Sequence, residues 1–149
     1  MAKLIRLIAA GLSLVGSNAA AAQTVNVSGN PGLLRISTAI AGSEPIAVSN
    51  SGTTYTVTTG NPNRPHKIMA RLSAPMPVGV TLTASLAAPP GATSLGPIAL
   101  DAIDRDVVLD IPRRTTATQA ITYALSATVA AGVIPNSSRT VTLTLVQQP

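Results

Sequence analysis

The chain has 149 residues and a formal net charge of +5 at pH 7, with one histidine, two tyrosines and no cysteine, tryptophan or phenylalanine. The absence of cysteine excludes disulfide bonds, cysteine nucleophiles and zinc sites built on cysteine. This length suits one domain with a core of Val, Leu, Ile, Ala and Met. The abundance of Thr, Ser, Gly and Pro favours short strands and tight turns over helices.

Residues 1–22 have the pattern of a secretory signal peptide. Lys3 and Arg6 form a basic start, an apolar stretch follows, and small residues end at Ala21 or Ala22, the expected cleavage positions. The apolar stretch is short for a bilayer span, although an uncleaved membrane anchor is the alternative. We predict a secreted protein, in the periplasm, at the cell surface or outside the cell. It would meet the membrane only through this peptide during export.

Residues 23–32 are predicted to form an N-terminal arm and linker, and residues 33–149 the folded domain. In the arm, Val25 and Val27 alternate with polar residues, which is a strand pattern. The Gly-Asn-Pro-Gly sequence that follows predicts a turn or linker.

Further along the chain, loops are expected wherever proline and glycine cluster. Residues 49–52 predict a hairpin turn, because Asn and Gly tolerate positive φ. Alternating and β-branched runs predict strands, and in the first of them Leu34 and Ile36 are expected to face inward. These strands are placed at residues 33–40, 46–48, 53–59, 66–74, 78–86, 95–100, 107–111, 120–129 and 140–146.

Residues 120–146 organise the predicted fold. Apolar residues alternate with small or polar ones in two runs, which are separated by a gap containing Gly132 and Pro135. We predict two antiparallel strands around a loop, with Tyr123 buried and the remaining strands packed against the pair. The whole pattern predicts an all-β protein, an antiparallel immunoglobulin-like sandwich of about seven to nine short strands.

Enzymatic chemistry has little support in the sequence. His66 follows Pro65 at the start of a predicted strand, where a solvent-facing position is expected, and no Gly-x-Ser-x-Gly motif accompanies it. Neither a nucleophile–base pair nor a metal set can be assembled, so we expect no catalytic residue and no cofactor.

An acidic run is the best candidate for a metal site. Asp101, Asp104, Asp106 and Asp110 could offer oxygen ligands to Ca²⁺. Their spacing does not match the calcium-loop signature, so a solvated loop and strand edge is the preferred interpretation. The arginines and Lys67 are likewise interpreted as solvated charge, and nucleic acid is excluded as a partner, because stacking aromatic residues are missing.

Two terminal segments are candidates for strand exchange, in which a strand is added to the sheet of a neighbour. The arm contributes Val25 and Val27, and the last strand contributes Val141, Leu143 and Leu145. Head-to-tail linkage of this kind does not close, so it builds a fibre. The alternative is that both segments pair within their own domain, which is favoured for the last strand because its expected partner lies just upstream.

The order of these features resembles exported bacterial β-sandwich proteins of the pilin and spore-coat-protein-U type. The shared features are a signal peptide, short strands rich in Thr, Val and Ala, the sequence ITYALSATVAAG and a final TVTLTL strand. The resemblance covers residues 33–146 and implies an extracellular structural or adhesive subunit, assembled by strand exchange.

The sequence therefore predicts a non-enzymatic exported structural or surface-assembly subunit, like a pilin or coat protein. Its partners would be itself or other exported surface proteins. The alternative is a monomeric extracellular binding module for carbohydrate or another surface ligand. Carbohydrate sites usually present exposed aromatic rings, and Tyr55 is the candidate for that role.

Overall fold

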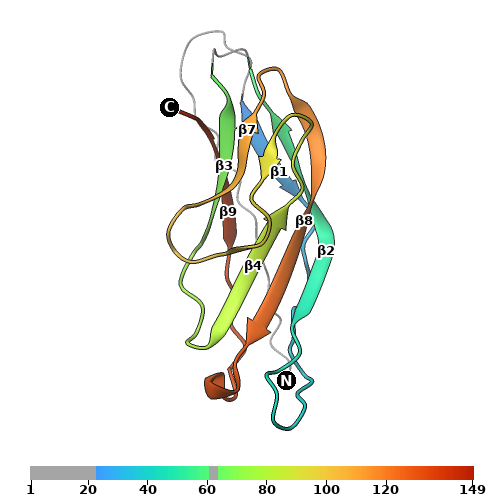
Figure 1. The fold of residues 1–149 in the computed structure, drawn as a ribbon, viewed down its shortest axis with the longest axis vertical. Coiled ribbons are helices and arrows are strands. Elements are labelled where there is room, and N and C mark those ends of the chain that lie inside the picture. Colours follow the sequence, from blue (N-terminus) through green and yellow to red (C-terminus); the bar gives the residue numbers. More distant parts are fainter. Residues whose placement is uncertain (1–22, 61–63) are drawn as a thin grey trace.

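The computed structural model describes residues 23–60 and 64–149, so the predicted signal peptide lies outside the described residues. Its strands form two packed layers (Figure 1). Sheet A has the order β1-β2-β8-β4-β6, and its strands are Thr24–Ser28, Val48–Thr58, Thr116–Ala127, Val80–Leu86 and Ile98–Ala99. Sheet B has the order β5-β7-β3-β9, and its strands are Thr93–Ser94, Arg105–Ile111, His66–Leu72 and Val141–Gln147.

All strand pairs in the two sheets are antiparallel. The prediction of an all-β antiparallel sandwich is confirmed, with nine strands in the described part of the chain. The helical structure within those residues is one short 3₁₀ turn, η1 (Val129–Ala131). No helix among residues 23–60 and 64–149 is long and apolar enough to cross a membrane.

The core lies between the sheets and follows the alternation of the strands. Inward side chains of sheet A, such as Tyr55, Ile121 and Tyr123, meet inward side chains of sheet B, such as Ile68 and Val107. Removing this apolar surface from water stabilises the fold by about 25 cal/mol for each Å² buried. The prediction that Tyr123 is buried is confirmed, since it is only 2% exposed.

The strand predicted at residues 33–40 is wrong, because these residues lie in the connection between β1 and β2. Leu34 does pack against the core as expected, but the segment makes no ladder. Pro31 has no N–H to donate, and Gly29 and Gly32 take positive φ values of 86° and 72°. These residues turn the chain away from β2 before a ladder can continue.

The hairpin turn predicted at residues 49–52 is also wrong. These residues lie inside β2, where the register shifts between Asn50 and Thr53. The Asn50 side chain accepts a hydrogen bond from the Gly52 N–H at 2.8 Å, so the local turn chemistry is used. Residues 49–52 form a bulge rather than a hairpin, because β2 pairs with β8 both before and after the bulge.

The two runs of residues 120–146 do not pair with each other, contrary to prediction. β8 lies inside sheet A between β2 and β4, whereas β9 lies at the edge of sheet B and pairs with β3. The connection through η1 carries the chain from one sheet to the other, so neighbours in sequence are not neighbours in a sheet (Figure 1).

Candidate functional site

The edge strands on the two long sides of the sandwich differ in length and in how they are connected. On one side the edge strands are β5 and β6, each only two residues long. They belong to different sheets, and the three residues 95–97 connect them directly. Very short edges protect a sheet from unwanted pairing, and here the chain itself also closes the side.

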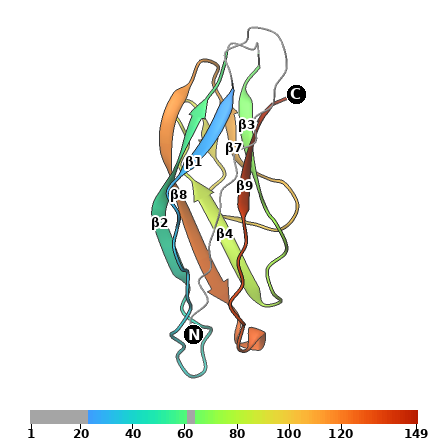
Figure 2. The same ribbon diagram turned by 180° about the vertical axis from the view of Figure 1, so that it is seen from behind.

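The opposite side is open. Its edges are β1 in sheet A and β9 in sheet B, and each of them pairs with one neighbour only in the part of the chain that the structure describes. The two strands lie next to each other, as Figure 2 shows with β1 in blue and β9 in dark red. They form no ladder with each other. We call this side the open seam and define it by five residues, Val25, Val27, Val141, Leu143 and Leu145.

The pairing of β9 with β3 shows which main-chain groups face the seam. In an antiparallel ladder, every second residue bonds to the partner strand and the residues between them point away. The N–H of Ser73 donates to the Thr140 carbonyl, and the N–H of Gln148 donates to the Pro65 carbonyl. The even-numbered residues of β9 therefore bond to β3, and the main-chain groups of its odd-numbered residues, 141 to 147, face the seam.

The main-chain groups of β1 divide between β2 and the seam in the same way. The Thr59 N–H donates to the Thr115 carbonyl, so the odd-numbered residues of β2 bond to β8 and its even-numbered residues bond to β1. In the β1–β2 register, the partners of those even-numbered residues are Thr24, Asn26 and Ser28. The main-chain groups of Val25 and Val27 therefore face the seam.

The side chains of these seam residues point into the sandwich. Val141 and Leu143 are 2% and 4% exposed, and Val25, Val27 and Leu145 are partly buried against the core. The open seam thus combines an apolar lining with main-chain donors and acceptors that no described strand pairs with. The structure brings together all five residues that the sequence nominated for strand exchange, and exchange itself stays a prediction.

One side-chain contact joins the two sheets at the end of the seam. Gln23, immediately before β1, accepts a hydrogen bond at Oε1 from Nε2 of His66 in β3, and the two atoms are 2.8 Å apart. Because Oε1 is a carbonyl oxygen, the imidazole donates this bond from Nε2. The sequence did not single out Gln23, since nothing near it in the chain indicates a partner in the other sheet.

His66 is fully buried, so its predicted solvent-facing position is wrong. It pairs with Ile111 of β7 on one side and with Gln147 of β9 on the other, and these neighbours cover it. Nδ1 has no hydrogen-bond partner among the described residues. Burial lowers the pKa of His66 below its ordinary value of 6.5, so the ring stays neutral at pH 7.

The four aspartates of the acidic run do not converge. Asp106 pairs with Lys67 at 2.9 Å, Asp104 with Arg71 at 3.9 Å, and Asp101 with Arg105 four residues further along. Hydrogen bonding from the Arg105 guanidinium is the main cause of the lowered pKa of Asp101. In the part of the chain that the structure describes, no three acidic or histidine side chains are grouped as metal ligands.

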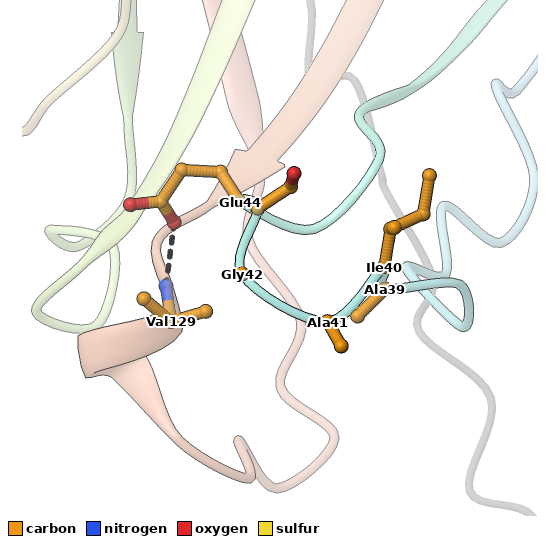
Figure 3. Close-up of a pocket in the computed structure, with 7 residues that line it drawn as sticks. Ala39, Ile40, Ala41, Gly42, Glu44 and Val129 are labelled. Atoms are coloured by element: carbon orange, nitrogen blue, oxygen red, sulfur yellow. Dashed lines mark hydrogen bonds between the residues drawn. The ribbon is translucent and has the colours of Figure 1, made fainter.

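A shallow, open pocket of about 600 Å³ lies at one end of the sandwich (Figure 3). It is lined by residues 39–44 and Val129. The Glu44 carboxylate accepts a hydrogen bond from the Val129 N–H at 2.6 Å, which ties the β1–β2 connection to η1. The other residues that line the pocket are apolar or glycine apart from Ser43, so the pocket offers one carboxylate that is already bonded.

Neither tyrosine is available to stack on a sugar. Tyr55 is 0% exposed and its hydroxyl donates to the Ala87 carbonyl at 2.6 Å. Burial raises the pKa of Tyr55 to about 12 and that of Tyr123 to about 12. The carbohydrate-binding alternative requires an exposed aromatic ring, and Tyr55 does not provide one.

No protein-family model matches the chain, and no curated protein matches it significantly. Among solved structures, the chain is similar to the crystal structure of the P pilus rod subunit PapA. The two share 10% sequence identity with a TM-score of 0.44, over 83% of this chain and 99% of the other. A similarity this distant identifies neither a family nor a function.

Proposed function

We propose that this protein is a non-enzymatic, exported structural subunit that associates with further copies by main-chain pairing at the open seam. The single observation that supports the proposal most is the seam itself. Two edge strands of five and seven residues lie side by side, and no ladder among residues 23–60 and 64–149 uses their outer main-chain groups. A strand supplied by another copy would extend a sheet there and cover apolar side chains.

The lining of the seam explains why another strand would be stabilised there. Long edge strands normally carry charge, proline or a bulge that discourages pairing. β1 and β9 have the sequences TVNVS and VTLTLVQ, with no charged residue and no proline. An added strand would also cover part of Val25, Val27 and Leu145, which pack only partly against the core. The missing protection distinguishes this side from the side that residues 95–97 close.

Export is the second part of the proposal and depends on the sequence of residues 1–22. Its basic start, apolar stretch and small residues up to Ala22 fit a secretory signal. The chain has no cysteine, so its fold does not depend on disulfide bonds and cannot be altered by thiol oxidation in an oxidising compartment. The N-terminal sequence of the protein recovered from the medium or periplasm tests this part, and a chain that begins at Gln23 is the expected result.

A proline in β9 tests pairing at the seam. In Leu145→Pro, the lost N–H faces the seam, so no bond to β3 is removed, and proline is accepted on edge strands in that orientation. The matched control is Leu145→Ala, which loses a similar amount of apolar packing, about 2 kcal/mol, but keeps the N–H. We expect Leu145→Ala to assemble like the unmodified protein and Leu145→Pro to lose the open-ended assemblies, as measured by light scattering after size-exclusion chromatography.

Val27→Pro and Val27→Ala repeat the comparison on β1, where the Val27 N–H also faces the seam. Thermal melts would confirm that each variant is folded before its mass is measured. A protein that is monomeric at every concentration, or proline variants that assemble as well as their alanine controls, would contradict assembly through the seam.

A further inference from the structure

The outer face of sheet A carries no charge. None of its five strands contains an Asp, Glu, Lys, Arg or His. The contrast with sheet B is sharp, because β3 contains Lys67 and Arg71, and β7 contains Arg105 and Asp106. Exposed surfaces of soluble proteins are normally about a quarter or more charged, so a sheet face without any charge needs a reason.

Hydroxyl groups replace charge on this face. With Tyr55 and Val57 pointing inward, the outward positions of β2 after its bulge are Thr54, Thr56 and Thr58. They lie opposite Ala120, Thr118 and Thr116 of β8 in register. Thr56 and Thr118 join through their Oγ1 atoms at 2.7 Å. The remaining outward positions of β1, β4 and β8 hold Thr, Ser and Ala with a single Asn.

A face of this composition is complementary to itself. A hydroxyl both donates and accepts hydrogen bonds, whereas an ammonium only donates and a carboxylate only accepts. Two copies of a molecule with a net positive charge repel each other through most contacts, but this face adds no local repulsion. The threonine methyl groups and alanines supply the apolar surface that such a contact would remove from water.

We infer that the outer face of sheet A binds the same face of a second copy, in a two-fold symmetric contact. The inference goes beyond the proposed function, because the seam links copies along a chain and this face would join them laterally. A symmetric contact of this kind closes on itself, so it forms pairs rather than fibres.

The size of the face sets the expected strength. β8 has 12 residues. At about 3.3 Å per residue and about 4.8 Å between strands, β8 with its neighbours covers roughly 600 Å² per copy. That area is at the lower end for a specific interface, so a weak and reversible dimer is expected.

Sedimentation velocity in a variant that cannot pair at the seam isolates this contact. In the Leu145→Pro background, we expect a concentration-dependent monomer–dimer equilibrium. Adding Thr118→Lys should weaken dimerisation about tenfold or more, because a symmetric interface buries the new charge twice. The matched control is Thr142→Lys, the same substitution on an outward position of β9 in sheet B, and it should leave the equilibrium unchanged.

If Leu145→Pro does not fold, the Val27→Pro background replaces it. A seam-blocked protein that stays monomeric at every concentration overturns the inference, and so does equal weakening by Thr118→Lys and Thr142→Lys. Either result leaves the proposed function standing, since assembly at the seam is measured in the unmodified protein. Conversely, failure of the proline test at the seam does not affect dimerisation through sheet A.

Discussion

At the scale of single residues, the alternation of apolar and polar residues along a strand predicts burial well. The residues adjacent in sequence predict it less well. Tyr123 was correctly assigned to the core from its place in an alternating run. His66 was wrongly assigned to solvent, because its position after Pro65 shows a strand beginning but not the two strands that flank it. Burial at a strand end depends on which strands lie beside it in the sheet, and the strand order could not be inferred from the sequence.

The buried histidine predicts an acid-sensitive fold. The pKa of His66 is lowered from 6.5 by burial, so below about pH 6.5 the unfolded chain binds a proton that the folded chain resists. Stability should therefore fall as the pH drops below 6.5 and level off below the folded pKa, with a slope of at most about 1.4 kcal/mol per pH unit. Urea unfolding between pH 7.5 and 5 measures this, because carboxylates stay mostly ionised there.

The comparison for that measurement is His66→Gln, which removes the titrating group and keeps a polar side chain. Its stability at pH 7.5 is expected to be lower, because the bond to Gln23 is disturbed. Its stability should nevertheless change much less between pH 7.5 and 5. An equally steep loss in His66→Gln would show that another group causes the pH dependence.

At the scale of elements, most strands could be predicted and their partners could not. The runs at residues 66–74, 78–86 and 107–111 correspond to β3, β4 and β7. The periodicity of a strand is local, so it is visible in the sequence. The pairing of β9 with β3 is not local, and the assumption that neighbours in sequence pair with each other led to the wrong partner.

The same limit applies to the candidate site. Each of the five seam residues was nominated from its own strand pattern and its position near a terminus. That β1 and β9 would lie side by side depends on the order of strands in both sheets. The charge-free face of sheet A was also visible only once the order β1-β2-β8-β4 was known.

The turn between β3 and β4 is expected to tolerate substitution of Gly79 poorly. Gly79 has a φ of 77°, and a Cβ there would lie 2.8 Å from the Ala131 Cβ and 2.8 Å from the Thr128 Oγ1. Gly79→Ala therefore combines backbone strain of about 1–2 kcal/mol with overpacking of about 1–3 kcal/mol against η1. Gly42→Ala is the matched control, with a φ of 81° and no atom within 4 Å of the added Cβ.

Melting temperatures distinguish the two glycine variants. Both should be lowered by strain, and Gly79→Ala should fall several degrees further, since about 1 kcal/mol corresponds to about 4 °C in a domain of this size. Equal melting temperatures would show that η1 moves freely and does not brace the β3–β4 turn.

At the scale of the whole molecule, the sandwich is asymmetric in two ways. One long side is closed by the chain and the other is the open seam. One sheet carries paired charges such as Lys67–Asp106, and the other carries hydroxyls without any charge. The two contacts proposed between copies use these two surfaces, the open seam and the outer face of sheet A.

Residue-resolved amide hydrogen exchange of β9 tests the central claim most directly, because it reads the main-chain groups themselves. In the monomer, the amides of Thr142, Thr144 and Val146, which bond to β3, should exchange slowly, and those of Leu143, Leu145 and Gln147, which face the seam, should exchange fast. In the assembled protein, the second set should become as protected as the first. Assembled protein in which Leu143, Leu145 and Gln147 still exchange at their monomer rates would contradict it.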